Sequence, residues 1–360
     1  MSKYVKIPKK FEAIDSHLHI HRLFEEERQM NFIDGHEWYK ESCGIKAINI
    51  ASLPRNASNN MAVALYKAAN ESTYAHGCIV YPESPVNPAT IGNMDPLTQY
   101  REMMEIGFDG IKFLEGKPEI YKRNLMPLDS DFYEPFWNQV EKDGTHILAH
   151  INDPEFFWDG DKVSDELKAK GWYYGDGTYL PSEDMYKQVD NLLEKHPNLC
   201  ITLAHFYFCS GKPEKLEDMF AKYKNVAVDI TPGGEMYVDF EANHDFYKEF
   251  FRKYSDKILF GTDGDFPRHV EAMSWLVDRI YRYLATDDKL MAFDDTLTEG
   301  ILLPDDKAKE ILSGNFIRRV GKTPRQINKK ALKNYIEKYK HLIPNKADYD
   351  LIMELSKKYL

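Results

Sequence analysis

The sequence has few cysteines and no long uncharged apolar run. Its four cysteines, Cys43, Cys78, Cys200 and Cys209, are scattered and form no C-x-x-C pair. This spacing argues against a disulfide scaffold and a thiolate zinc site, and it favours a reducing compartment. No apolar stretch is long enough to span a bilayer, and residues 1–10 lack the apolar segment of a secretory signal. We therefore expect a cytoplasmic protein that has no membrane partner.

An excess of positive charge, which marks many nucleic-acid-binding proteins, is also missing. The chain of 360 residues has 47 Lys and Arg against 58 Asp and Glu, so its formal net charge is -11. This balance argues against nucleic acid as the main partner. The chain is 43% hydrophobic and 13% aromatic, which is too apolar for a disordered protein.

Eight short apolar runs, rich in Ile, Val and Leu, alternate with longer polar stretches. Such runs are typical of strands that are buried on both faces, as in a parallel sheet covered by helices. The predicted strands cover residues 11–19, 44–51, 77–81, 108–114, 145–150, 199–205, 226–230 and 258–263. The intervening stretches carry apolar residues at helical spacing. This alternation predicts an α/β fold of the TIM-barrel type, (β/α)8.

Two domains are predicted, a barrel over residues 1–320 and a helical extension over residues 321–360. The extension has 10 Lys and Arg against 4 Asp and Glu, a net charge of +6, which leaves -17 on the barrel. Its apolar residues recur at helical spacing, so it has a face to bury. We expect it to pack either on its own acidic barrel or on a neighbouring subunit, which would make a homo-oligomer.

Polar residues stand at the C-terminal ends of the predicted strands, where TIM barrels carry their active sites. They are His17, His19, Lys112, His150, His205 and Asp263. Residues two apart on a strand point to the same face, so His17 and His19 can reach one metal ion. Imidazole nitrogen and carboxylate oxygen are ligands of zinc and its neighbours. Six other histidines are interpreted as ordinary core or surface residues: His36, His76, His146, His196, His244 and His341.

These residues also carry a family resemblance. The segments Asp15-Ser-His-Leu-His19, Gly110-Ile-Lys112, Ala204-His205 and Gly261-Thr-Asp263, with His150 and residues 311–318, resemble the amidohydrolase superfamily. They look most like its amidohydrolase 2 branch, which holds TIM-barrel metal-dependent hydrolases and the aminocarboxymuconate-semialdehyde decarboxylase type. The resemblance covers residues 11–320, and H-x-H followed by His, His and Asp in strand order is specific for the superfamily.

The resemblance implies a role for each matching position. His17, His19, His150 and Asp263 match the metal ligands, and Asp263 would also take a proton from the reacting water. His205 matches a histidine that orients or deprotonates this water rather than binding the metal. In binuclear members a strand-four lysine is carbamylated and bridges two metals, but Gly-Ile-Lys is also common in the amidohydrolase 2 branch, where it does not prove a carbamate.

We therefore expect one divalent metal, with zinc as the default and manganese or iron as alternatives. A second metal on a carbamylated Lys112 is not expected. Lys112 is interpreted as an electrostatic or substrate-binding group, or else as part of a salt bridge inside the barrel. Arg22, Asn152 and Arg268 follow strand ends and are predicted substrate contacts, and an arginine near a metal suits a substrate carboxylate.

About 30 residues separate His150 from the next predicted helix, and loops of this length are usually lids or binding loops. The loop is rich in aromatic residues: Phe156, Phe157, Trp158, Trp172, Tyr173 and Tyr174. These rings either cover a pocket or pack the loop down, and we favour packing.

The leading predicted function is hydrolysis of an amide, ester or lactone bond in a small molecule. A bound divalent ion lowers the pKa of its water to about 7, which supplies the nucleophile. The alternative is a metal-dependent, non-oxidative decarboxylase, which would use the same ligands with an arginine-rich pocket and release carbon dioxide. A third hypothesis, a non-catalytic binding barrel, predicts the loss of at least one ligand, and the sequence retains them all.

Overall fold

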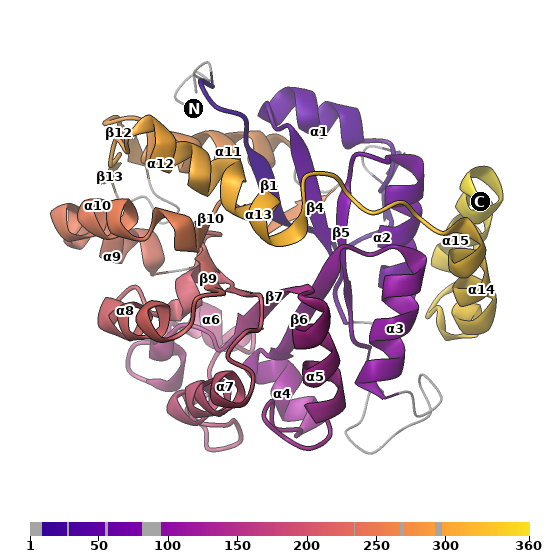
Figure 1. Ribbon diagram of the computed structural model, residues 1–360, viewed down its shortest axis with the longest axis horizontal. Helices are drawn as coiled ribbons and strands as arrows, with labels where there is room; N and C mark the ends of the chain where they lie inside the picture. Colours follow the sequence, from indigo (N-terminus) through magenta and orange to yellow (C-terminus); the bar gives the residue numbers. More distant parts are fainter. Residues whose placement is uncertain are drawn as a thin grey trace.

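A sheet of parallel strands forms the centre of the fold in this computed structural model (Figure 1). The structure describes residues 9–26, 29–54, 57–80, 95–233, 235–266, 270–291 and 297–360. The order across the sheet is β10-β9-β8-β7-β6-β5-β4-β1-β11. The strands are β1 (Ile14–Ile20), β4 (Ala47–Ala51), β5 (Tyr74–Cys78), β6 (Gly110–Gly116), β7 (His146–Ile151), β8 (Ile201–Leu203), β9 (Val226–Asp229), β10 (Ile258–Leu259) and β11 (Gly264–Phe266).

One chain segment, residues 258–266, closes this sheet into a barrel. Its first part, β10, pairs with β9, and its last part, β11, pairs with β1. Between them, the Ser16 amide donates to the Phe260 carbonyl (3.2 Å), and the Asp263 amide donates to the His17 carbonyl (2.7 Å). The segment is therefore the eighth strand, which joins both ends of the sheet. The predicted TIM barrel is confirmed.

Helices cover the outside of the barrel (Figure 1). Those in the barrel are α1 (His36–Cys43), α2 (Ala57–Ala69), α3 (Pro96–Ile106), α4 (Pro118–Asn124), α5 (Glu134–Asp143), α6 (Asp165–Ala169), α7 (Ser182–Lys195), α8 (Pro213–Lys222), α9 (Met236–Ala242), α10 (His244–Lys253), α11 (Val270–Ala285), α12 (Asp305–Lys309) and α13 (Asn315–Val320). In the described part of the chain, none of the helices has the length and hydropathy needed to cross a membrane.

Shorter elements complete the chain. Within the described residues there are two antiparallel pairs, β2 (Phe24–Glu25) with β3 (Met30–Asn31) and β12 (Lys289–Met291) with β13 (Leu297–Glu299). The single turns are η1 (Glu155–Trp158), η2 (His205–Phe208), η3 (Ser255–Lys257), η4 (Glu310–Gly314) and η5 (Lys340–Leu342).

Local sequence accounts for the helix ends and for the buried helix faces. Asp95 caps α3, because its Oδ1 accepts a hydrogen bond from the Thr98 amide at 2.8 Å, and Pro96 occupies the first helical position. The predicted apolar stripe of α7 is buried against the barrel: Met185, Val189, Leu192 and Leu193.

One strand lies three residues earlier than predicted. The sequence places the third strand at residues 77–81, whereas β5 covers Tyr74–Cys78. Gly77 lies inside this strand, where a β-carbon would stand 2.3 Å from Met103 Sδ. Its missing side chain lets α3 pack closely on the sheet. The shift also places His76 inside the barrel wall, where it is buried.

The C-terminal extension, α14 (Lys329–Tyr339) and α15 (Lys346–Tyr359), packs against α2 and α3 of the same chain (Figure 1). Lys338 Nζ lies 2.7 Å from Glu102 Oε1 on α3, and Tyr339 donates to the same carboxylate at 3.0 Å. The apolar face of the extension is buried: Leu332, Tyr335, Ile336, Ile352 and Leu355. The basic extension therefore packs on its own barrel, the first of the two arrangements expected.

Candidate metal centre

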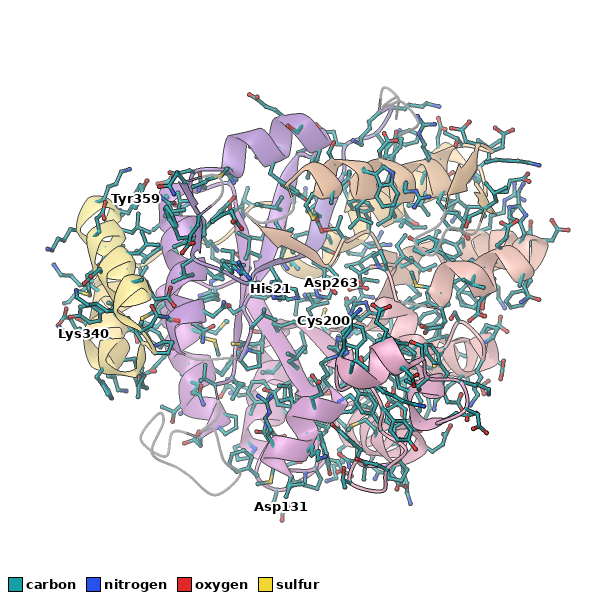
Figure 2. The ribbon with its side chains drawn as sticks, turned by 180° about the vertical axis from the view of Figure 1, so that it is seen from behind. His21, Asp131, Cys200, Asp263, Lys340 and Tyr359 are labelled. Carbon is teal, nitrogen blue, oxygen red and sulfur yellow. The ribbon has the colours of Figure 1, made fainter. Side chains whose placement is uncertain are left out.

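The predicted metal-site residues gather at the C-terminal ends of the strands. His17 and His19 lie on β1, His150 on β7, His205 two residues after the end of β8, and Asp263 between β10 and β11. The four histidines are buried, whereas the Asp263 side chain is 37% exposed. Figure 2 labels Asp263 near the centre of the molecule. The group therefore combines a buried imidazole cluster with a carboxylate that solvent can reach.

His17 and His19, the first histidine pair, direct their Nε2 atoms at each other across 3.1 Å. Their other nitrogens are engaged, since His17 Nδ1 donates to Asp229 Oδ2 (2.9 Å) and His19 Nδ1 donates to the Ala51 carbonyl (2.6 Å). A neutral imidazole has one donor and one acceptor nitrogen. Both Nε2 atoms therefore carry lone pairs. Asp263 Oδ1 lies 3.4 Å from Nε2 of His17 and 3.1 Å from Nε2 of His19.

His150 and His205, the second histidine pair, repeat this arrangement. His150 Nδ1 lies 3.2 Å from His205 Nε2. His150 Nε2 donates to Asp153 Oδ1 (3.1 Å), and His205 Nδ1 donates to the hydroxyl and carbonyl oxygens of Thr231 (3.1 and 3.3 Å). The two facing nitrogens are again lone-pair atoms. His205 Nε2 is 3.9 Å from Asp263 Oδ2, so this carboxylate lies beside both pairs.

The donor set fits a divalent cation. Burial, aided by the charge of Lys112, lowers the pKa of His17 to about 3, and burial, aided by Lys117, lowers that of His150 to about 3. These imidazoles therefore stay neutral, as metal ligands must be. Ligand atoms of a tetrahedral zinc lie about 3.4 Å apart, given bonds of about 2.0–2.1 Å. The distances among the first pair and Asp263 match this edge length.

Three of the four predicted ligands lie in one tight group, and the fourth lies beside it. His17, His19 and Asp263 offer ligand atoms that are all within 4.8 Å of one another. His150 faces His205 instead and reaches the group through that residue.

Lys112 is fully buried on β6, and its Nζ donates to His17 Nε2 at 2.7 Å. Burial lowers the pKa of this lysine to about 8. The ammonium group thus occupies the lone pair that a metal would use, and the two cannot share this nitrogen. Its partner is a histidine of the first pair, so Lys112 belongs to the candidate centre.

Asp229, which the sequence reasoning missed, orients residues of both pairs. Its Oδ2 accepts from His17, and its Oδ1 accepts from the His205 amide (2.8 Å) and from the amide and hydroxyl of Thr231 (3.1 and 2.5 Å). Burial raises the pKa of this carboxyl, but the neighbouring His17 and these hydrogen bonds outweigh it and lower the pKa to about 2. A carboxylate at the end of the apolar run 226–230 was the available signal, since burying one is costly unless it is used.

The backbone is strained where two of these side chains leave their strands. His205 has φ of 57° and Asp263 has φ of 54°, and residues 206–208 also have positive φ. Non-glycine residues adopt this left-handed region at an energetic cost, and such residues cluster at functional sites. The sixth strand therefore ends at Leu203, before the predicted residue 205.

Asp15 helps to hold the turn before Asp263, because Thr262 donates to both of its oxygens (2.6 and 3.1 Å).

A chain of buried polar groups also crosses the barrel interior. His76 Nδ1 donates to Asn49 Oδ1 (2.7 Å), His146 Nδ1 donates to His76 Nε2 (2.8 Å), and Thr202 donates to His146 Nε2 (2.8 Å). A β-carbon on Gly110 would lie 2.4 Å from His76 Nε2, so the missing side chain leaves room for the His76 ring. His76 and His146 are thus satisfied core histidines.

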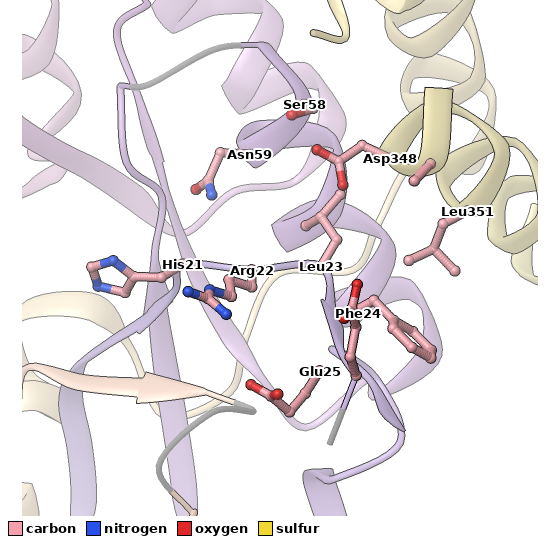
Figure 3. Close-up of a pocket in the computed structure, with 11 residues that line it drawn as sticks. His21, Arg22, Leu23, Phe24, Glu25, Ser58, Asn59, Asp348 and Leu351 are labelled. Carbon is pink, nitrogen blue, oxygen red and sulfur yellow. The ribbon is translucent and has the colours of Figure 1, made fainter. Parts of the chain in front are cut away.

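The predicted substrate contacts do not share one site in the structure. Arg22 is exposed and lines a cavity of about 560 Å³ between the segment after β1, the start of α2 and the start of α15 (Figure 3). His21 lines the same cavity, and its ring centroid is 5.7 Å from that of His19. Asn152 is buried, and its Nδ2 donates to Ser182 at the start of α7 (3.0 and 2.8 Å). Arg268 lies outside the described residues.

Glu235, on the loop after β9, is a second residue that the sequence reasoning missed. Both of its carboxyl oxygens are shielded from solvent and have no hydrogen-bond partner among the described residues. A β-carbon built on Gly233 would lie 3.7 Å from Glu235 Oε2 and 3.6 Å from His205 Cβ. Glu235 therefore lies near the second histidine pair. Burial, together with Asp239 and Asp153, raises the pKa of Glu235 to about 7.

The barrel and its strand-end histidines define a class, the metal-dependent enzymes built on a TIM barrel. Residues 14–318 match the amidohydrolase family, and the chain belongs to this family. Its members are metal-dependent enzymes and include hydrolases and decarboxylases. A search of the curated proteins finds no match for this chain.

Solved structures similar to this one include an uncharacterised TIM-barrel protein from Bordetella bronchiseptica, with 15% identity, 86% of this chain and 98% of that chain covered, and a TM-score of 0.54. Another is 5-carboxyvanillate decarboxylase from Sphingomonas paucimobilis, with 13% identity, coverage of 86% and 99%, and a TM-score of 0.53. A third is a probable 2-pyrone-4,6-dicarboxylic acid hydrolase from Acinetobacter baumannii, with 10% identity, coverage of 86% and 99%, and a TM-score of 0.51. At these identities the similarity shows the shared fold.

Proposed function

We propose that this protein hydrolyses an amide, ester or lactone bond of a small molecule and uses one divalent metal, zinc. The observation that carries the proposal is the lone-pair geometry of the first histidine pair beside Asp263. His17, His19 and Asp263 supply three ligands, and His150 supplies the fourth. A divalent cation held there would polarise the scissile carbonyl and lower the pKa of a water molecule to about 7.

Asp263 and His205 are the proposed catalytic residues that handle protons. The two oxygens of Asp263 face different groups. Oδ1 lies beside the ligand nitrogens of the first pair, and Oδ2 is 3.9 Å from His205 Nε2. A proton that Asp263 removes from the reacting water can pass to this lone pair, because His205 Nδ1 keeps its own proton on Thr231. Asp229, which accepts from the His205 amide, lies close enough to stabilise the resulting imidazolium.

A second candidate function is the non-oxidative decarboxylation of a small carboxylic acid. The observation that favours it is Arg22, which lines the cavity beside His21, because a guanidinium group pairs well with a carboxylate. Lys112 would add a second positive charge next to His17. We propose Arg22, Lys112, Asn152 and Arg268 as substrate-binding residues under either function.

A substrate panel on zinc-loaded protein tests these functions against each other. Amides, esters, lactones and aromatic carboxylic acids would be offered, with product analysis for hydrolysis and for carbon dioxide. Hydrolysed product without carbon dioxide supports the first function, and carbon dioxide release supports the second. Elemental analysis that finds no stoichiometric zinc, manganese or iron after metal-supplemented expression would contradict both.

We also propose that the protein works in the cytoplasm on a small molecule and has no nucleic-acid partner. All four cysteines are free thiols in the structure, which supports a reducing compartment. The net charge of -11 supports the absence of a nucleic-acid partner. A homo-oligomer remains part of the proposal, and the mass in solution measures it.

A further inference from the structure

The long loop after β7 folds around a small apolar cluster of its own. Phe157, Val163 and Tyr174 form its buried centre. Partly buried residues pack around them: Phe156, Trp158, Leu167, Tyr173 and Tyr179. The rings of Phe157 and Tyr174 meet edge to face, with centroids 5.7 Å apart. Most of the aromatic residues therefore pack the loop down, as the sequence reasoning favoured, and they make the loop a compact unit.

Tyr174 joins this unit to the candidate metal centre. It is 1% exposed, and its hydroxyl donates to Asp153 Oδ2 at 2.8 Å. Lys117 Nζ, at the start of α4, donates to both oxygens of the same carboxylate (2.8 and 2.9 Å). Asp153 Oδ1 in turn accepts from His150 Nε2 at 3.1 Å. One buried carboxylate thus connects the loop, a lysine and a predicted metal ligand.

We propose that Tyr174 and Lys117 are positioning residues that act through Asp153 on His150, so that the loop of residues 153–181 sets the affinity of the centre for its metal. This inference rests on the proposed function, in which His150 is a metal ligand.

The physical basis is the restraint of one carboxylate by several donors. Lys117 spans both oxygens and Tyr174 holds Oδ2, so the carboxylate cannot rotate away from His150. Because Asp153 Oδ1 accepts from His150 Nε2, the proton of His150 stays on Nε2 and its lone pair on Nδ1. Partners of this kind fix the orientation and tautomer of a ligating histidine.

Zinc affinity measured by competition with a chelating dye tests the inference. Asp153→Ala removes the whole connection, and we expect zinc binding to weaken about 10- to 100-fold. Tyr174→Phe removes only the hydroxyl contact, and we expect a loss of at least about threefold. Tyr179→Phe is the matched control, because this ring packs on Tyr174 in the same loop, and we expect an unchanged affinity.

Tryptic cleavage of the loop provides a second readout that needs no substrate. Coupling between two sites is reciprocal, so a loop that favours metal binding must itself be favoured by the metal. Lys162, Lys168 and Lys170 are exposed cleavage sites within the loop. We expect zinc to slow cleavage there in the wild type and in Tyr179→Phe, and to slow it less in Tyr174→Phe.

The two readouts separate the inference from the function on which it rests. If wild-type protein binds no zinc, the proposed function falls and the inference falls with it. If wild type binds zinc, but Tyr174→Phe matches Tyr179→Phe in affinity and in cleavage, the inference alone is overturned. If Asp153→Ala unfolds, the comparison of the two tyrosine variants still decides the outcome.

Discussion

The two histidine pairs have similar internal geometry but different supports. The protons of the first pair are held by Asp229 of β9 and the Ala51 carbonyl of β4, both parts of the barrel wall. In the second pair, His150 is held by Asp153, which follows β7, and His205 by Thr231, which follows β9. The wall of a closed barrel is rigid, whereas loops can be remodelled at less cost to the fold. The first pair is therefore the fixed part of the centre, and the second is the adjustable part.

This difference predicts that metal binding fails first when the first pair is lost. In the double variant His17→Ala with His19→Ala, two of the four proposed ligands are gone, and we expect no stoichiometric zinc by elemental analysis. The barrel should stay folded by circular dichroism, because the strands keep their backbone pairing. His341→Ala, on the C-terminal extension, is the control and should retain its metal. A double variant that keeps its zinc would show that the centre lies elsewhere.

Asp229→Asn breaks the support of the first pair without removing a ligand. Three donors fix the oxygen on the side of His205 and Thr231, so the new amide nitrogen would face His17 Nδ1. That donor forces the His17 proton onto Nε2, which then cannot bind a metal. We expect zinc affinity to fall about 100-fold, the upper end for loss of a supporting group. Dye competition measures it, and a loss smaller than that of Asp153→Ala would reverse our ranking of the two supports.

Glu235→Gln tests the loop after β9, near the second histidine pair, by measuring how the stability of the metal-free protein changes with pH. The folded-state pKa of Glu235 is about 7 against an ordinary value of 4.5, so the unfolded chain loses this proton first. Wild-type stability therefore falls as the pH rises from about 4.5 to about 7. Glutamine cannot ionise, and we expect the variant to gain about 2–3 kcal/mol relative to wild type between pH 4 and pH 8. Urea unfolding at both pH values measures this, and a pH-independent difference would refute it.

Gly110→Ala disturbs the barrel interior rather than either support. The new methyl group would lie 2.4 Å from His76 Nε2 and 2.5 Å from the His146 carbonyl oxygen. We expect a stability loss of about 1–3 kcal/mol by urea unfolding, as for overpacked cores. Gly211→Ala is a contrasting change at an exposed position without positive φ, where Asp239 Oδ2 lies 3.7 Å from the added carbon, an ordinary contact distance. Equal losses in the two variants would mean that crowding at Gly110 is unimportant.

The sequence predicted the barrel because its signals are local. Apolar runs and helical stripes follow from which faces each element must bury, and strand ends must meet at one end of a parallel barrel. That logic also selected His17, His19, His150, His205 and Asp263, which the structure brings close together. It misplaced β5 because a glycine is unusual inside a strand, and the close approach of Met103 that requires Gly77 there cannot be seen in the sequence.

The supporting residues were harder to predict because their partners are distant in sequence. Asp229 meets His17 only after the barrel closes, 212 residues apart. Asp153 and Tyr174 lie in an irregular loop, where no periodicity indicates the direction of a side chain. In the sequence, Glu235 looks like any surface acid. Its burial and its lack of a hydrogen-bond partner among the described residues are seen only in the structure.

The most direct test of the central claim is a crystal structure of the zinc-loaded protein with anomalous diffraction at the zinc edge. We predict one zinc peak per chain, within about 2.0–2.2 Å of His17 Nε2, His19 Nε2, His150 Nδ1 and an oxygen of Asp263. Lys112 Nζ should have left His17 Nε2, since the two cannot share that nitrogen. A zinc peak between His150 and His205, or none at the first histidine pair, would contradict the account.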